Sequence, residues 1–232
     1  MKTILRSGGV LLAVFCLICC GSAAETAVAP QAMDPWNGIW ETESYIMTIM
    51  QNGSVITGMY EPKEGVSVDP GVIEGTVSAD GRTCSGTWTE TGPVTYTMSD
   101  DAMAYTGIIG VSLNGTVIDP DIPATIGTRS LPSLDPQHFW AGTWNADRYT
   151  VNLVQDGTRV TGTYTPLSSV NDEPGTLEGS VSENGRLFTA TWQERGRISF
   201  TLAADGSFFN GTYTIQPDLD AASDSWNGNR IA

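Results

Sequence analysis

Residues 149–164 read Tyr-Thr-Val-Asn-Leu-Val-Gln-Asp-Gly-Thr-Arg-Val-Thr-Gly-Thr-Tyr, and residues 45–60 read Tyr-Ile-Met-Thr-Ile-Met-Gln-Asn-Gly-Ser-Val-Ile-Thr-Gly-Met-Tyr. Each stretch alternates its side chains around one turn-forming pair, Asn52-Gly53 in the first and Asp156-Gly157 in the second. A two-residue hairpin turn needs positive φ at its central residues, which Asn, Asp and Gly tolerate best. The chain therefore encodes the same β-hairpin twice.

The turn also predicts the register of each hairpin. Tyr45 then faces Tyr60, Tyr149 faces Tyr164, and alternate residues share one face because a strand has a period of two. The outward face is apolar in the first hairpin and mostly polar in the second, and an exposed apolar patch usually marks a contact site. We expect this interface patch to pack on the second repeat or on a partner, with Ile46 opposite Met59 and Met50 opposite Val55.

The repetition extends well beyond the hairpins. Trp36 and Trp140 open matching stretches 104 positions apart, and the offset holds without a gap up to Gly107 and Gly211. Such agreement indicates an internal duplication. We predict repeat 1 over residues 36–129, a proline-containing linker over 130–139 and repeat 2 over 140–232.

Turn signals divide each repeat into eight short strands. Repeat 1 has them near 38–43, 45–51, 54–61, 71–78, 82–90, 93–99, 103–112 and 125–129, and repeat 2 near 142–147, 149–155, 158–165, 175–182, 186–194, 197–203, 207–215 and 226–230. Sequential strands with short turns predict an antiparallel meander, which loses its exposed edges by closing on itself. The predicted fold class is all-β, with two tandem small eight-stranded up-and-down barrels after a signal peptide. Alternation places Cys84 and Trp88 inside, and Cys84 is expected to be a buried core thiol.

The first and last strands carry a resemblance. Gly38-Ile-Trp40 and Gly142-Thr-Trp144 open the repeats, while Arg129 and Arg230 close them. A Gly-x-Trp first strand with a closing arginine over the indole resembles the calycin superfamily, which includes lipocalins and avidins. The resemblance implies a barrel with a tendency to bind ligands, in which each arginine stacks on the tryptophan of its own repeat.

Two inward carboxyl groups allow two interpretations. Glu90 and Glu194 share the face of Trp88 and Trp192, near the end of a strand. We expect them to join Arg129 and Arg230, with Gln51 and Gln155, in polar plugs that close the barrels. The barrel-closing residues are then Trp40, Glu90, Arg129, Trp144, Glu194 and Arg230. The alternative is a general acid of a hydrolase, which needs a second carboxylate across a cleft.

The N-terminus predicts export. Lys2 and Arg6 precede an apolar run that ends in Ser22-Ala23-Ala24, as in a secretory signal peptide, and the run is too short to span a membrane. We assign residues 1–24 to this signal and 25–35 to an exposed lead-in, with lipid attachment at Cys20 as a variant. The mature chain keeps only Cys84, so it has no intramolecular disulfide.

Composition excludes several function classes. A net charge of −15 argues against nucleic acid and anionic membranes as partners. His138, the one histidine, lies in the linker with no expected partner, so no triad or zinc site is predicted. Asp218, Asp220 and Asp224 do not follow a calcium loop, and no cofactor is predicted. Asn52, Asn114 and Asn210 match the glycosylation pattern, although turn chemistry also explains their Asn-Gly pairs.

We therefore predict an exported or envelope-associated, non-enzymatic binding protein whose partner is an unknown protein or small molecule. A lipocalin-like carrier of a small hydrophobic molecule and a carboxylate hydrolase are the alternatives. A protease inhibitor on such a scaffold is also conceivable, but no residue selects it. Large inward side chains leave little room inside the repeats, so a ligand is expected at an open end, an outer face or the seam between domains.

Overall fold

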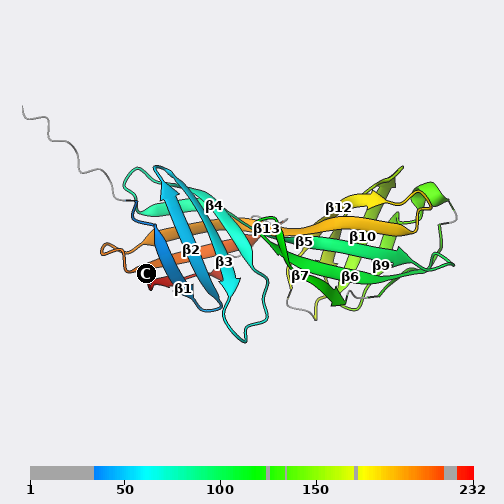
Figure 1. Ribbon diagram of the computed structural model, residues 1–232, viewed down its shortest axis with the longest axis horizontal. Helices are drawn as coiled ribbons and strands as arrows, with labels where there is room; N and C mark the ends of the chain where they lie inside the picture. The colour runs from blue at the N-terminus through cyan, green and yellow to red at the C-terminus, as the bar shows by residue number, and fades with distance from the viewer. Residues whose placement is uncertain (1–33, 124–125, 134, 170–171, 217–223) are drawn as a thin grey trace, which may run out of the picture. The chain divides into compact units, whose positions relative to one another are not determined.

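The chain is all-β and antiparallel. The computed structural model describes residues 34–123, 126–133, 135–169, 172–216 and 224–232 (Figure 1). The strands pair into one extended network. Repeat 1 contributes β1 (Gly38–Thr42), β2 (Tyr45–Asn52), β3 (Val55–Pro62), β4 (Gly71–Val77), β5 (Thr83–Met98), β6 (Ala104–Leu113), β7 (Thr116–Pro123) and β8 (Gly127–Thr128). After the 3₁₀ turn η1 (Pro136–His138), repeat 2 contributes β9 (Gly142–Asn145), β10 (Tyr149–Asp156), β11 (Arg159–Pro166), β12 (Gly175–Val181), β13 (Leu187–Leu202), β14 (Phe208–Ile215), β15 (Asp224–Ser225) and β16 (Gly228–Arg230).

The signal peptide predicted over residues 1–24 lies outside the described residues, as do Cys20 and most of the lead-in. Within the described part of the chain, no helix is long and apolar enough to cross a membrane.

The first hairpins form where predicted, but their register differs by two residues. The ladder continues to Asn52 opposite Val55, so Gly53-Ser54 forms the turn and Tyr45 pairs with Pro62. Gly53 has a φ of 61°, as the first central residue of a type II′ turn requires. A shift of two residues leaves each side chain on its predicted face. The Asn-Gly turn with positive φ at both residues occurs instead at Asn114-Gly115, which joins β6 to the unpredicted strand β7.

The predicted breaks between the fifth and sixth strands of each repeat are wrong. β5 and β13 each continue for 16 residues, and alternate residues stay buried along both strands. Neither Gly92 nor Gly196 has the positive φ of a tight turn. Their role is close approach: a Cβ at Gly92 would lie 1.7 Å from the Gly110 carbonyl oxygen, and one at Gly196 would lie 1.6 Å from that of Thr214.

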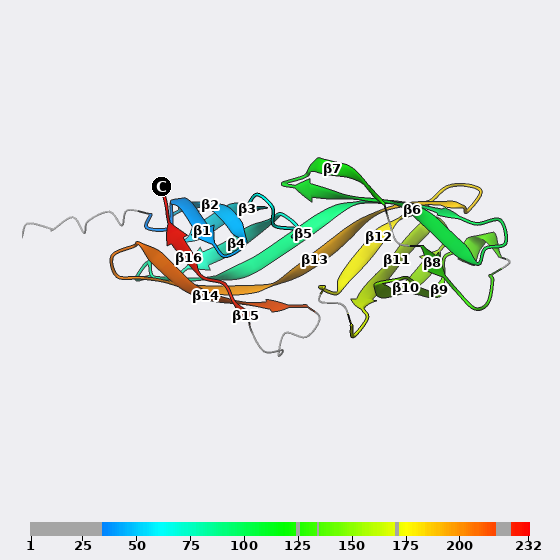
Figure 2. The same cartoon turned by 90° about the horizontal axis from the view of Figure 1, so that it is seen from below.

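β5 and β13 pair with each other, and this pairing exchanges strands between the repeats. Their ladder runs from Thr83 opposite Thr201 to Thr97 opposite Leu187. The first half of β5 also pairs with β4, while its second half pairs with β6. β13 likewise passes from β12 to β14. Figures 1 and 2 show β5 and β13 side by side along their length.

Two closed circuits of paired strands result. Circuit A runs β1-β2-β3-β4-β5-β13-β14-β16 and returns to β1, and circuit B runs β9-β10-β11-β12-β13-β5-β6-β8 and returns to β9. Each circuit takes its first strands from one repeat and its last strands from the other. The predicted separation into a domain at 36–129 and a domain at 140–232 is therefore wrong, because β5 and β13 do not turn back at their central glycines.

The two hydrophobic cores follow the circuits rather than the repeats. The core of circuit A combines Trp36, Trp40 and Tyr60 with Phe200 and Phe209 of repeat 2. The core of circuit B mirrors it, with Trp140, Trp144 and Phe188 packed around Tyr96 and Tyr105 of repeat 1. Cys84 is fully buried in core A, as predicted, and burial raises the pKa of its thiol to about 12.

In the arginine–tryptophan contacts, the arginine of each repeat stacks on the tryptophan of the other repeat. The guanidinium carbon of Arg230 lies 4.3 Å from the centre of the Trp40 ring, and that of Arg129 lies 4.3 Å from the Trp144 ring. Each arginine was predicted on the tryptophan of its own repeat, and that pairing is wrong. The last strand of each repeat lies beside the first strand of the other, β16 beside β1 and β8 beside β9.

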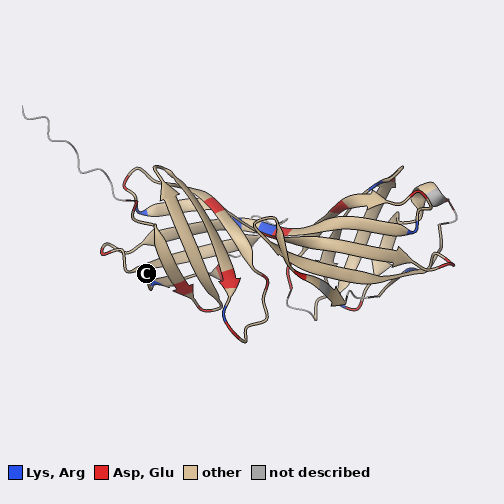
Figure 3. Cartoon of the chain, viewed as in Figure 1, with Lys and Arg blue, Asp and Glu red and all other residues tan. Residues whose placement is uncertain are grey.

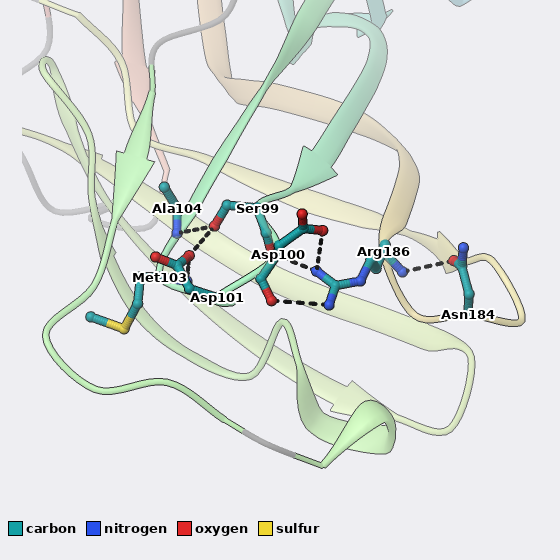
Figure 4. A network of polar contacts seen from close by, with 7 residues as sticks. All are labelled: Ser99, Asp100, Asp101, Met103, Ala104, Asn184 and Arg186. Atoms are coloured by element: carbon teal, nitrogen blue, oxygen red, sulfur yellow. Dashed lines mark hydrogen bonds and ion pairs between the residues drawn. The ribbon is translucent and has the colours of Figure 1, made fainter.

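Polar contacts at the end of circuit B also join the repeats. Arg186, beside the β12–β13 turn, donates to the carbonyl oxygens of Ser99 and Asp100 after β5 (Figure 4). In the turn between β5 and β6, Asp101 accepts hydrogen bonds from the Ser99 hydroxyl and the Met103 amide. These contacts fix the far end of β5 against β13.

We expect Phe209→Ala to lower the free energy of unfolding by about 3–5 kcal/mol, because a fully buried ring would leave a cavity. Phe209 lies 5.3 Å from Trp40 and 4.6 Å from Phe200 between ring centres. Phe208→Ala is the matched control, since Phe208 is 40% exposed. In denaturant titrations, a double-mutant cycle should couple Phe209 to Trp40 but not to Trp144. Coupling to Trp144 instead would contradict the exchange.

Candidate functional site

A cavity of about 1120 Å³ lies beside the middle of the β5–β13 ladder. Strands of both circuits and both repeats contribute to its wall. The residues with polar or aromatic side chains include Tyr45, Tyr60, Asp69, Trp88, Glu90, Tyr149, Tyr164, Asp172, Glu173, Trp192, Glu194, Tyr213 and Trp226. Its volume lies slightly above the usual range of small-molecule sites, which is roughly 300–1,000 Å³.

Glu90 and Glu194 lie at the centre of this wall. They are directly opposite each other in the β5–β13 ladder, so their side chains share one face. Each is 8% exposed. Glu90 accepts a hydrogen bond of 2.9 Å from the Tyr60 hydroxyl, and Glu194 accepts one of 2.8 Å from Tyr164. The second oxygen of each carboxyl makes no hydrogen bond within the described part of the chain, so it remains available to a ligand.

Burial favours the protonated form of both acids. Loss of hydration raises the pKa of Glu90 from 4.5 to about 9 and that of Glu194 to about 8. The tyrosine hydrogen bonds act in the opposite direction but are outweighed. Neighbouring carboxyls raise both values further, including Glu194 for Glu90 and Asp69 for both.

Glycines position the two tyrosines. Tyr60 pairs with Gly71 on β4, and Tyr164 pairs with Gly175 on β12. A Cβ at Gly71 would lie 2.3 Å from the Tyr60 hydroxyl oxygen, and one at Gly175 would lie 2.2 Å from that of Tyr164. Only glycine therefore lets each ring lie across the neighbouring strand and reach its glutamate.

The indoles in the wall differ in their hydrogen bonding. Trp88 donates to the Thr214 carbonyl oxygen at 3.0 Å, and Trp192 donates to that of Gly110 at 2.7 Å. Both N–H groups are thus occupied by backbone. Trp226 is 9% exposed, and its buried Nε1 has no hydrogen-bond partner among the described residues.

Three further acids line the cavity with few counter-charges. Asp172 accepts from Arg148 and from the Tyr149 hydroxyl at 2.7 Å. Burial is the main cause of the raised pKa of Asp69 and of Glu173. The described lining holds seven carboxyl side chains, including Glu41 and Glu43 at its edge, against the one guanidinium of Arg148. Lys and Arg are sparse in the whole chain (Figure 3), 11 against 26 Asp and Glu.

The predicted barrel-closing set is therefore divided in two. Trp40, Trp144, Arg129 and Arg230 form the stacked contacts described above and do not line the cavity. Glu90 and Glu194 are not part of any plug with the arginines, and that prediction is wrong, because their partners are Tyr60 and Tyr164. Gln51 and Gln155 instead accept hydrogen bonds from the backbone of Trp36 and Trp140.

The predicted interface patch is exposed on circuit A. Met50, Val55 and Met59 are 60%, 51% and 37% exposed, and Ile46 is half-buried. Repeat 2 does not cover them, so that alternative is wrong, while contact with a partner stays a prediction. The predicted cross-strand pairs shift with the register: Ile46 lies opposite Glu61, and Met50 lies opposite Thr57.

The remaining candidates do not form a site. His138 has a partner, contrary to the prediction: its Nδ1 lies 2.8 Å from Asp135 Oδ2, with both side chains 57% exposed. Asp218 and Asp220 lie outside the described residues, and no described cluster of His, Cys, Asp or Glu could hold a metal ion. Asn52, Asn114 and Asn210 are exposed, and their glycosylation stays a prediction.

Comparisons with known proteins add no assignment. A scan against protein-family models, a search of curated proteins and a search of solved structures each gave no match.

Sequence reasoning missed the tyrosines and the acids of the connecting segments. Tyr60, Tyr164, Asp69 and Glu173 all keep their chemistry across the 104-residue offset, as do Glu90 and Glu194. The sequence signal for these residues was that both copies keep a tyrosine and a carboxyl at equivalent positions. That signal identifies a site only once the two copies are known to line the same cavity.

Proposed function

We propose that this protein is a non-enzymatic binding protein whose ligand is an organic cation held in the cavity beside Glu90 and Glu194. The charge imbalance of the lining carries this proposal. Seven carboxyls line the cavity with Arg148 as the one basic side chain among the described lining residues, and a cationic ligand would add positive charge beside them. Tyrosine and tryptophan rings in the same wall suit an ammonium group, which is attracted to aromatic faces.

Binding is expected to release protons. Glu90 and Glu194 are neutral in the empty cavity below about pH 8, whereas a bound ammonium favours their ionised form. The affinity for a cation should therefore rise between pH 5 and pH 8.

Isothermal titration calorimetry tests the proposal with a panel of primary and quaternary ammonium compounds and their uncharged isosteres. We expect charged members to bind and Glu90→Gln with Glu194→Gln to weaken them at least ~100-fold, since the removed charges are buried. Glu74→Gln with Glu178→Gln is the matched control, because these duplicated glutamates are exposed. Equal binding of the uncharged isosteres, or no binding by any cation, would refute the proposal.

A carboxylate hydrolase is the second candidate, because Glu90 and Glu194 face each other beside a wide cavity. Hydrolysis with two carboxyls needs one protonated and one ionised group. Here burial raises the pKa of both carboxyls and a tyrosine hydrogen bond opposes the rise in each, so the two groups are alike, which favours binding over catalysis. Turnover of a glycoside that stops in Glu90→Gln would reverse this preference.

A lipocalin-like carrier is supported less well. The interior of circuit A is filled by Trp36, Trp40, Phe200 and Phe209, all fully buried, and circuit B has matching residues. We further propose that each circuit is a small eight-stranded barrel of calycin type, and that the protein is exported. A mature N-terminus near residue 25 in secreted material would support export.

A further inference from the structure

We infer that the ligand of the cavity carries two positive charges, one held by each repeat, as in an aliphatic diamine. This inference rests on the proposed function and deepens it, since it specifies the class of cation. The observation behind it is that the cavity contains the same half-site twice.

The two half-sites are related by the 104-residue offset of the duplication. Tyr45, Tyr60, Asp69, Trp88 and Glu90 line the cavity from repeat 1. Their counterparts in repeat 2 line it too, namely Tyr149, Tyr164, Glu173, Trp192 and Glu194. Each half-site therefore offers a buried glutamate, its hydrogen-bonded tyrosine, a second tyrosine, an indole and another acid.

The β5–β13 ladder makes these half-sites face each other. Antiparallel strands are related by a local two-fold axis, and Glu90 opposite Glu194 places this axis between the two glutamates. The Glu90 carboxyl is hydrogen-bonded to Tyr60 of circuit A, and the Glu194 carboxyl is hydrogen-bonded to Tyr164 of circuit B. One oxygen of each carboxyl makes no hydrogen bond to the residues that the structure describes. A ligand with two ammonium groups joined by a short alkyl spacer matches this arrangement.

A single monovalent ligand would occupy one half-site and leave the second without a ligand. Filling both with separate ions would require two association events, whereas a tether makes the second event intramolecular. A diamine therefore uses the duplicated site most fully.

Beyond the shared core, the surroundings of the half-sites differ. Tyr213 and Trp226 line the cavity on the side of circuit A, and the position that matches Tyr213 in circuit B is Ile109. The indole N–H of Trp226 also lacks a hydrogen-bond partner within the described residues. The two ends of the ligand thus meet unlike neighbours, and the loss in Glu90→Gln need not equal the loss in Glu194→Gln.

Calorimetry at pH 8.5 with ethylenediamine, putrescine, cadaverine and hexamethylenediamine tests the inference, with butylamine and pentylamine as matched monoamines. We expect one diamine per chain, bound at least ~10-fold more tightly than its monoamine. Glu90→Gln or Glu194→Gln should reduce the best diamine to the level of the monoamine. Tyr60→Phe, which leaves the carboxyl in place, should have a smaller effect, and Glu74→Gln with Glu178→Gln should have none.

Different failures are separable. Two monoamines per chain, with no gain for any diamine, would overturn the dication and leave the proposed cation site standing. Monoamine binding that survives in the double Gln variant would place the cation elsewhere and overturn both. Absence of binding by diamines, monoamines and quaternary ammonium compounds alike would also overturn both.

Discussion

The free energy of unfolding should fall by roughly 7 kcal/mol between pH 5 and pH 8, because two buried carboxyls resist ionisation in the folded chain. Glu90 and Glu194 have pKa values of about 9 and about 8 in the folded state, against 4.5 for an ordinary glutamate. Between pH 4.5 and about pH 9, the folded chain therefore binds more protons than the unfolded chain. Stability is therefore greatest below pH 4.5 as far as these groups are concerned, and it declines as pH rises toward 8 to 9.

Chemical denaturation at several pH values, compared between the parent chain and Glu90→Gln with Glu194→Gln, isolates this contribution. An amide stays neutral and can still accept the tyrosine hydrogen bond. The variant should lose most of the decline and be the more stable chain at pH 8. Glu74→Gln with Glu178→Gln should keep the parent's decline. A parent and a double Gln variant with the same pH dependence would show that the two glutamates ionise freely.

Much of the fold is local and was predictable. Alternation along each strand placed Cys84, Trp88, Phe188 and Trp192 on the buried face, and all four are buried. The registers shifted by two residues because the turns use Gly53 and Gly157 as their first central residue. Parity survives such a shift, so the inward and outward sets remained correct while the cross-strand partners did not.

The exchange of strands was not predictable from one repeat at a time. A duplicated chain offers every strand two nearly equivalent neighbours, one in its own copy and one in the other. The difference arises at Gly92 and Gly196, where the glycine allows a neighbouring backbone to approach closely and the strand continues without a turn. Local sequence does not separate these two uses, because glycine satisfies both.

The site depended on that exchange. Inward parity identified Glu90 and Glu194 as unusual, but a closed barrel in each repeat left only an arginine plug to explain them. Once β5 pairs with β13, the two glutamates lie opposite each other and share one cavity. The sequence shows that both repeats keep a glutamate at this position, but only the pairing of β5 with β13 shows that the two glutamates form one site.

A chain limited to repeat 1 should not fold as a monomer. Circuit A takes β13, β14 and β16 from repeat 2, and their loss would expose Trp36, Trp40 and Tyr60. Two copies of repeat 1 could restore both circuits by pairing β5 with β5 across a true two-fold axis, since the repeats are alike. We therefore expect the fragment to be unfolded when dilute and to fold only as it dimerises.

The molar mass of residues 34–133, measured by light scattering over a range of concentrations together with circular dichroism, tests the strand exchange most directly. Our account predicts that native-like β structure appears only with a mass of two chains and is lost on dilution. A folded single chain whose structure does not depend on concentration would contradict it, because each repeat would then complete its own sheet.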